Sequence, residues 1–319
     1  MSTVETVRGP VDAGELGTTL PHEHILIMEP EALANYGTVY GPCYWNEEVR
    51  VADAIAKLTR VREAGITTIV DPTTPGLGRY IPRIQRINES VDLNIVVATG
   101  LYAFLALPNF LAYREVDAIA ELFVREIREG INDTGVKAAF LKCAVEAHGL
   151  IGDVPRVLAA VAAASVETGA PVMVHTNAAA RTAFAALETL TGAGVDPARI
   201  VIAHMGDSND MGYLREVAAS GAWLGLDRFG IDHFNPIADR VATLLTLLEE
   251  GLGDRIHLSH DGACFIDFFT GNPAFAEEQP DYLLITKTVL PQLLQAGATQ
   301  ADIDRMMVGN PRRFLAREP

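Results

Sequence analysis

The sequence of 319 residues predicts a single α/β domain with the (β/α)₈ (TIM) barrel fold. Short apolar runs alternate with helical patterns along the whole chain, most of the helical patterns close on glycine, and polar residues follow the apolar runs. No linker or low-complexity tract divides the chain. We therefore expect residues 1–319 to form one α/β domain, since barrels of this kind often occupy about 250 residues or more.

Eight apolar runs are predicted as strands. They are rich in β-branched residues and nearly continuously apolar, which is typical of parallel strands buried on both faces. The predicted strands are Leu20–Ile27, Ile66–Thr73, Asn94–Gly100, Lys137–Val145, Pro171–Asn177, Ile200–Gly206, Trp223–Gly230 and Ile256–Gly262.

The segments between these runs are predicted as helices. Glu47–Ala64 places Val51, Ile55 and Leu58 on one stripe and stops before Gly65, a residue suited to the position after a helix. The other predicted helices are Val116–Gly130, Asp153–Gly169, Ala179–Gly194, Met211–Gly221, Pro236–Gly251, Pro291–Ala296 and Ala301–Met307. Three long connections follow strands and are expected on the catalytic face: Met28–Asn46, Leu101–Glu115 and Ala263–Gln279.

Composition excludes several classes of function. Hydrophobic residues make up 49% of the chain, and the formal net charge is −16, which argues against nucleic acid or an anionic membrane as a partner. The chain has neither a signal-peptide pattern nor 18 uninterrupted apolar residues, and its three cysteines lack zinc-finger spacing. The expected location is the cytoplasm.

Polar residues gather at the carboxyl ends of the predicted strands, where barrels build their active sites. His22 and His24 lie two residues apart, a spacing that puts both side chains on one face of a strand. One such pair arises by chance often enough to mean little alone. Six such residues at predicted strand ends are much harder to explain by chance and indicate a metal site: His22, His24, Lys142, His175, His204 and Asp261.

Lys142 lies inside a predicted buried strand, where desolvation lowers the pKa of a lysine. Two functions are consistent with a buried neutral amine. One is a Schiff base with a carbonyl substrate, as in barrel aldolases. The other is reaction with carbon dioxide to give a carbamate (N6-carboxylysine), whose two oxygens can bridge two cations. The surrounding histidines and Asp261 favour the carbamate.

The ordered motifs PHEH, FLK, VHT, IAH, DRFG and SHD resemble the phosphotriesterase-related branch of the amidohydrolase superfamily over nearly the whole chain. The segments GLGRYIPRI, ATGLY, LDRFGID and NPRRF are most similar to its lactonases, which open N-acyl homoserine lactones in quorum quenching. This resemblance implies two divalent ions per chain (zinc, cobalt, iron or manganese), bridged by a carboxylated lysine and a hydroxide that attacks the substrate.

The resemblance also implies roles for individual residues. His22, His24 and Asp261 would hold the buried ion, His175 and His204 the more exposed one, and carboxylated Lys142 would bridge them. Asp261 would also transfer a proton. Tyr102 would face the hydroxide and the lactone, and Arg228 would orient the lactone-side loops; without the family, Arg228 could simply pair with Asp227 or Asp232.

Apolar residues in the loops after the strands predict the substrate pocket, in which Tyr102, Arg228, Phe229, Phe265 and Phe268 would contact a lactone or ester. The same apolar loops could instead form a subunit interface, and the resemblance implies a homodimer. The leading hypothesis is a lactonase with side activity on organophosphate triesters. The alternatives are a true phosphotriesterase or another carboxylic-ester hydrolase, a Schiff-base aldolase acting through Lys142, and a metal-binding barrel without turnover.

Overall fold

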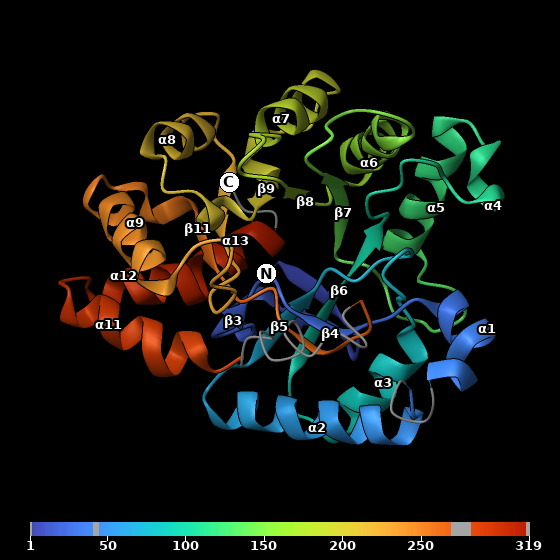
Figure 1. The fold of residues 1–319 in the computed structure, drawn as a ribbon, viewed down its shortest axis with the longest axis horizontal. Coiled ribbons are helices and arrows are strands. Elements are labelled where there is room, and N and C mark those ends of the chain that lie inside the picture. Colours follow the sequence, from blue (N-terminus) through green and yellow to red (C-terminus); the bar gives the residue numbers. More distant parts are fainter. Residues whose placement is uncertain (1, 41–44, 269–281, 317–319) are drawn as a thin grey trace.

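The computed structural model describes residues 2–40, 45–268 and 282–316. Parallel strands form a central barrel, and helices surround it as a ring (Figure 1). The fold is the predicted (β/α)₈ barrel. Parts of two of the long connections, residues 41–44 and 269–279, lie outside the described residues.

Eight strands form one sheet in the order β11-β10-β9-β8-β7-β6-β5-β3, and every pair in it is parallel. Their bounds are β3 (Thr19–Leu20), β5 (Thr68–Asp71), β6 (Asn94–Gly100), β7 (Phe140–Val145), β8 (Val172–Thr176), β9 (Ile200–Ala203), β10 (Trp223–Leu226) and β11 (Ile256–Leu258). Most of these strands end before the polar residues that were predicted to lie within them, because those residues leave the ladder and turn toward the barrel mouth.

The first predicted strand, Leu20–Ile27, is wrong as one unit. It is split into β3 and β4 (His24–Ile27), and β4 pairs in parallel with β12 (Ala263–Ile266), a strand that the sequence reading left inside a loop. Pro21 lies at the break and lacks the backbone N–H that a continuous ladder requires.

The helices on the outside of the barrel follow the predicted alternation. Their bounds are α1 (Pro30–Tyr40), α2 (Glu47–Glu63), α3 (Ile81–Ser90), α4 (Asn109–Ala112), α5 (Val116–Arg128), α6 (Val154–Thr168), α7 (Ala183–Gly192), α8 (Met211–Ala219), α9 (Ile237–Glu249), α11 (Leu290–Gln295), α12 (Gln300–Asp304) and α13 (Asn310–Leu315). The sequence reading missed α1, α3 and α4. Two π-helical turns, Ile285–Val289 and Arg305–Gly309, precede α11 and α13.

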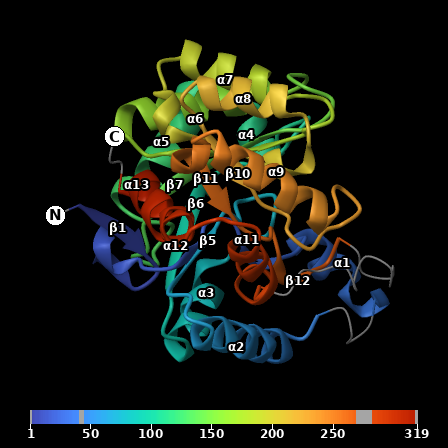
Figure 2. The ribbon, with the colours of Figure 1, turned by 90° about the vertical axis from the view of Figure 1, so that its left-hand side faces the viewer.

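A hairpin of β1 (Thr3–Thr6) and β2 (Gly9–Asp12) lies at the end of the barrel opposite α1 and β12 (Figure 2). Its Val4 packs into an inner cluster with strand residues such as Phe140, Met173 and Trp223. A larger cluster fills the layer between strands and helices. Among the described helices, none is both long and apolar enough to cross a membrane.

Candidate metal centre and active-site cavity

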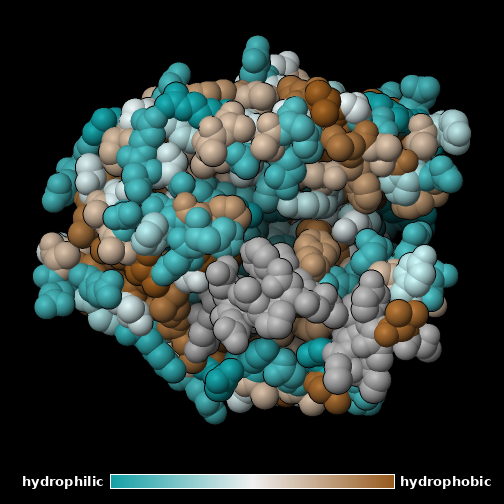
Figure 3. Space-filling model, viewed as in Figure 1, coloured by the Kyte–Doolittle hydropathy of each residue, from teal (hydrophilic) through white to brown (hydrophobic). Residues whose placement is uncertain are grey.

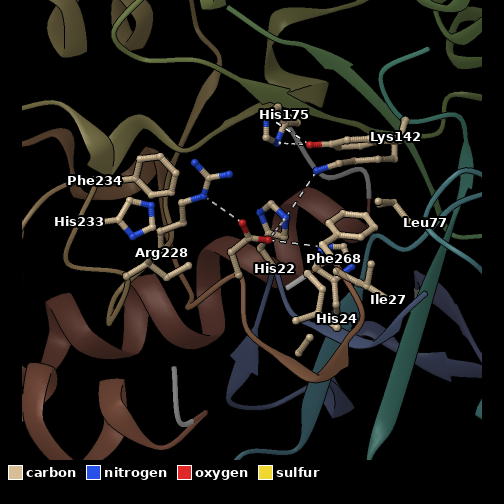
Figure 4. Close-up of a pocket in the computed structure, with 15 residues that line it drawn as sticks. His22, His24, Ile27, Leu77, Lys142, His175, Arg228, His233, Phe234 and Phe268 are labelled. Carbon is tan, nitrogen blue, oxygen red and sulfur yellow. Dashed lines mark hydrogen bonds and ion pairs between the residues drawn. The ribbon is translucent and has the colours of Figure 1, made fainter. Parts of the chain in front are cut away.

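Strand alternation directs two predicted ligands into the barrel. Phe140 and Met173 belong to the inner cluster, so Lys142 and His175, two residues further along β7 and β8, point the same way. Cys143 points outward and packs in the strand–helix layer. Both inward side chains line a cavity at the carboxyl ends of the strands, together with His22, His24 and Asp261 (Figure 4). The sixth predicted ligand, His204, lies behind this lining and contacts His175.

The break after β3 changes the face on which the next side chains lie. Leu20 packs outward, yet His22 and His24 both reach the cavity. The two imidazoles converge on one carboxylate oxygen: Nε2 of His22 lies 3.2 Å from Oδ1 of Asp261, and Nε2 of His24 lies 3.3 Å from the same atom. The amine of Lys142 lies 3.5 Å from Nε2 of His22.

The Nδ1 atoms of three of these histidines contact residues outside the cavity. Nδ1 of His22 and Nδ1 of His204 lie 2.7 Å from the two oxygens of Asp227. Nδ1 of His24 lies 2.8 Å from the hydroxyl of Thr73. Such contacts fix the ring orientation and leave Nε2 for a metal, as carboxylates do behind the histidines of many metal sites. The sequence reading treated Asp227 only as a possible partner of Arg228, although its position at the end of β10 was a usable signal.

Three residues of the site have left-handed backbone conformations that residues other than glycine rarely adopt. The φ angles are +68° for His204, +65° for Arg228 and +53° for Asp261. Each lies just beyond the end of its strand, and the turn redirects its side chain toward the cavity. Strain of this kind costs about 1–3 kcal/mol per residue and persists where the surrounding structure holds it.

Tyr102 reaches the site from the end of β6. Its hydroxyl donates a hydrogen bond of 3.0 Å to Oε1 of Glu146, and the same oxygen lies 3.0 Å from Nε2 of His175. Nδ1 of His175 lies 2.7 Å from Nε2 of His204. The hydrogen bond from His175 lowers the pKa of Glu146 to about 2, so this carboxylate is charged at neutral pH. No role had been predicted for Glu146.

The electrostatics of the site suit metal ligands. Burial lowers the pKa values of His175 and His204, which favours the neutral imidazole that binds a metal. Burial also lowers the pKa of Lys142 to about 8. Burial opposes ionisation of Asp261, but His22 and His204 outweigh it and hold the pKa of that carboxyl well below its usual range.

A row of alternating charges leads from the cavity to α9. Nε of Arg228 lies 3.0 Å from Oδ2 of Asp261, and Nη1 of the same guanidinium lies 2.8 Å from Oδ2 of Asp207. Buried Arg240 donates to the other oxygen of Asp207 at 2.7 Å. Asp207 therefore supports Arg228, whose ion pairs in the described part of the chain are with Asp207 and Asp261 rather than with Asp227 or Asp232.

The cavity has a volume of about 340 Å³ and combines this polar floor with apolar walls. Figure 4 shows Phe234 and His233 on one side of the polar groups and Phe268 and Leu77 on the other. His233 is exposed and also lines the cavity. Of the predicted aromatic contacts, Tyr102 and Phe268 line it.

Two predicted substrate contacts are wrong. Phe229 is only 1% exposed and packs in the core between strands and helices, because the left-handed turn at Arg228 turns it away from the cavity. Phe265 lies on β12 and packs against Trp45, with the guanidinium of Arg50 4.0 Å from the centre of its ring. Neither side chain lines the cavity.

The donor set fits divalent metal ions. His22, His204 and Asp261 each offer a ligand atom, and these atoms lie within 4.8 Å of one another. Neutral imidazoles and a carboxylate are the ligands that zinc and similar ions prefer. A buried amine among them has no anionic partner within hydrogen-bond distance in the described part of the chain, and a carbamate at that position would add two more oxygen ligands.

Comparison with known proteins agrees with this geometry. The model of the phosphotriesterase family matches residues 2–315. The chain belongs to the phosphotriesterase family. It is therefore a hydrolase of ester bonds of the metal-dependent kind that this family comprises.

Phosphotriesterase-family relatives match the chain over almost its full length. A phosphotriesterase homology protein of Mycobacterium tuberculosis is 44% identical, covering 100% of this chain and 99% of the relative. An aryldialkylphosphatase of Saccharolobus solfataricus is 34% identical, covering 96% of this chain and 97% of the relative. The solved structure of the phosphotriesterase from M. tuberculosis superposes with a TM-score of 0.93 at 44% identity, covering 98% of each chain.

Proposed function

We propose that this phosphotriesterase-family hydrolase opens lactone rings, N-acyl homoserine lactones among them, with two divalent metal ions, and that it hydrolyses organophosphate triesters as a side activity. One ion would be held by His22, His24 and Asp261 and the other by His175 and His204, with Lys142 between them. The observation that supports this most is one cavity with apolar walls that five of these side chains line, with the sixth, His204, directly behind His175 and close to His22 and Asp261.

The metal ions, when bound, would supply Lewis acidity and lower the pKa of a water molecule toward neutrality. The chain's own residues would do the rest. Burial favours the neutral imidazoles of His175 and His204, and the contacts from Asp227 and Thr73 fix the rings of His22, His24 and His204. This rigidity lowers the cost of arranging the site for reaction.

Lys142 is proposed to act as a carbamate. Its pKa of about 8 leaves a substantial fraction of neutral amine at working pH, and only the neutral amine attacks carbon dioxide. The attack forms an N–C bond and releases one proton, so the product is an anion with two oxygens. Such an anion would satisfy two cations, whereas an ammonium among the same ligands would repel them.

Proton transfer is assigned to Asp261. Arg228 holds Oδ2 of this carboxylate at 3.0 Å, while Oδ1 faces His22 and His24. An ionised carboxylate in this place can accept a proton from the attacking water and pass it to the leaving oxygen. Arg228 remains charged throughout, because a guanidinium does not lose its proton in proteins. Tyr102, which lines the cavity beside His175, is proposed to contact the substrate.

The walls of the cavity favour an ester with an apolar tail. The lining side chains of apolar character are Ile27, Leu77, Ile231, Phe234, Ala263, Ile266 and Phe268. Phe268 is 52% exposed at the mouth, where it can cover an acyl chain. A lactone would place its ring carbonyl on the polar floor and its acyl chain along these walls.

A true phosphotriesterase is the second candidate, because the relative from S. solfataricus is named an aryldialkylphosphatase. The deciding experiment compares kcat/KM for N-acyl homoserine lactones of increasing chain length with kcat/KM for paraoxon, on enzyme loaded with cobalt, zinc or manganese. The proposal predicts that at least one lactone is the better substrate by about tenfold or more. More efficient turnover of paraoxon than of every lactone would favour the second candidate.

Two variants sharpen the same assay. Phe268→Ala should raise KM most for the lactones with the longest acyl chains, since it removes part of the apolar mouth. Leu122→Ala is the control, because Leu122 is 39% exposed on α5 and does not line the cavity. An aldolase acting through Lys142 would be trapped covalently by borohydride in the presence of a carbonyl substrate, and we expect no such adduct.

We also propose that the chain forms a homodimer through the catalytic-face loops. Tyr36 and Val39 on α1 are 58% and 77% exposed, and Phe110 and Tyr113 beside α4 are 64% and 91% exposed. Figure 3 shows hydrophobic groups on this face, including over α1. Light scattering on the purified protein should give about twice the chain mass of 34.3 kDa. Val39→Asp should shift the mass toward a monomer.

A further inference from the structure

Glu23 lies between His22 and His24 and is fully buried, yet it faces away from the cavity. Its carboxylate receives four hydrogen bonds, all from residues 259–262. Oε1 accepts from the Ser259 hydroxyl at 2.8 Å, from the His260 backbone N–H at 2.9 Å and from Nδ1 of His260 at 2.5 Å, and Oε2 accepts from the Gly262 N–H at 3.0 Å. Four donors match the capacity of an ionised carboxylate.

The orientation of His260 is determined by its second ring nitrogen. Nε2 of His260 accepts a hydrogen bond of 3.1 Å from the backbone N–H of Ile285, in the π-helical turn before α11. A nitrogen that accepts a hydrogen bond carries no hydrogen, so Nδ1 is the donor toward Glu23. The histidine thus links the carboxylate to the closing helices and cannot rotate without breaking both bonds.

These contacts lie at the seam where the barrel closes. Within the described residues, β3 pairs only with β5 and β11 only with β10, while β4 and β12 pair further along the chain. Between them, residues 21–23 and 259–262 belong to no strand. The Glu23 carboxylate joins these two segments, and three further contacts assist it: His22 N–H to the Ser259 hydroxyl at 2.9 Å, Asp261 N–H to the His22 carbonyl at 3.1 Å and His24 N–H to the Gly262 carbonyl at 2.8 Å.

We propose that Glu23 is a positioning residue that sets His22 and His24 at the correct distance from Asp261. The proposal rests on the metal site proposed above and adds a residue that touches neither metal nor substrate. These three ligands come from the first and last segments of the barrel. The Glu23 side chain joins those two segments across the seam. Its bonds fix the residues on both sides of Asp261, whose φ of +53° requires such support.

Glu23→Gln tests the proposal because it keeps the size of the side chain and replaces one oxygen with an NH₂ donor. Each carboxylate oxygen of Glu23 accepts a hydrogen bond from a backbone N–H. The NH₂ group of glutamine would face one of these N–H donors, so the two segments at the seam would have to move apart. Zinc affinity is measured by competition with a chromophoric chelator. We expect one of the two zinc equivalents to bind about 10–100-fold more weakly and the other to stay within about threefold of the parent.

Asn310→Ser supplies a matched control for general destabilisation. Asn310 is also fully buried, and its amide donates to the carbonyls of Gly253 and Ile256, at the opposite end of β11 from Asp261. This variant should lower Tm but leave both zinc affinities at the parent values. If Glu23→Gln lowers Tm and also leaves both affinities unchanged, Glu23 only supports the fold and the proposal is wrong.

Ser259→Ala keeps the test decisive if Glu23→Gln does not fold. It removes one of the four donors to Glu23 and the acceptor of the His22 N–H, and it should weaken the same zinc equivalent by a smaller factor. Parent affinity in a folded Ser259→Ala protein would also count against the proposal. A parent protein that binds no zinc, cobalt or manganese would instead contradict the proposed function, so the two failures are distinguishable.

Discussion

At the scale of single residues, the site depends on hydrogen bonds and ion pairs that hold its ligand side chains in place. Asp227 contacts the Nδ1 atoms of His22 and His204, and the guanidinium of Arg228 bridges the carboxylates of Asp261 and Asp207. Each of the six proposed ligands is buried or nearly so. Ionisable groups of this kind are costly to bury without partners, so they indicate chemistry more than stability.

Lys142→Ala should lower kcat/KM for the best substrate by at least about 100-fold, because losing a proposed metal ligand should cost no less than losing a residue that orients one. Short carboxylic acids such as acetate or propionate should restore part of the activity, since the alanine leaves room for a carboxylate to bridge the ions. Lys287→Ala is the control, as Lys287 is exposed on the surface. Full activity in Lys142→Ala would rule out its bridging role.

His257 should make the protein sensitive to acid. It is buried beside Trp223 and Phe314, and within the described residues neither ring nitrogen has a side-chain hydrogen-bond partner. Burial lowers its pKa from 6.5 to about 3, so the unfolded chain binds a proton that the folded chain refuses. Stability from this residue is present above pH 6.5 and is lost as the pH falls toward 3.

At pH 5 this loss amounts to about 2 kcal/mol. Urea unfolding at pH 7 and pH 5 measures it. The free energy of unfolding of His257→Leu should fall between the two pH values by about 2 kcal/mol less than that of the parent. Equal losses in the two proteins would show that His257 is charged, or otherwise paired, in the folded state.

At the scale of elements, regular segments were predictable and the turns around the site were not. β6 was predicted with its observed bounds, and α2 and α5 start at the predicted residues, because continuous apolar runs and amphipathic stripes are local signals. α1 was missed because its sequence contains Gly37 and β-branched residues, which favour helices weakly. β12 exists because it pairs with β4, a contact between distant segments that no local pattern specifies.

The candidate site shows the same division. The six proposed ligands could be chosen from the sequence because they follow apolar runs. Asp227 was recognisable by its place at a strand end, but its partner and those of Glu23 could not be identified, since they lie more than 200 residues away: His22 for Asp227, and Ser259 and His260 for Glu23. Phe229 was misassigned because the left-handed turn at Arg228 reverses the expected alternation of faces.

Gly100 is required where β6 meets β7. Its φ is +109°, and an added Cβ would lie 2.1 Å from the carbonyl oxygen of Lys142. Gly100→Ala should therefore reduce the free energy of unfolding by at least about 2 kcal/mol and displace Lys142. Gly65→Ala is the matched control, because Gly65 has a φ of +91° but nothing within 4 Å of the added atom, so only about 1 kcal/mol is expected.

Urea unfolding of both variants checks this difference. A similar small loss in each would mean that backbone conformation alone matters at Gly100. Zinc binding by folded Gly100→Ala protein adds a second measurement, since a displaced Lys142 should weaken it while Gly65→Ala should not.

At the scale of the whole molecule, the barrel brings together residues that are scattered over 240 positions of the sequence. The six proposed ligands lie at the ends of the first, fourth, fifth, sixth and last predicted strands, and only closure of the sheet into a barrel makes them neighbours. The family model and the solved relative cover nearly the whole chain, which agrees with one domain serving one site. The net charge of −16 favours a neutral or apolar substrate over an anionic one.

The central claim is that hydrolysis by this protein requires two bound metal ions per chain. Removal of metal by a chelator, followed by titration with zinc or cobalt while lactone hydrolysis and bound metal are measured together, tests it directly. We predict that activity disappears with the metal and returns in step with the binding of two ions per chain. A metal-free preparation that retains full activity would contradict the account.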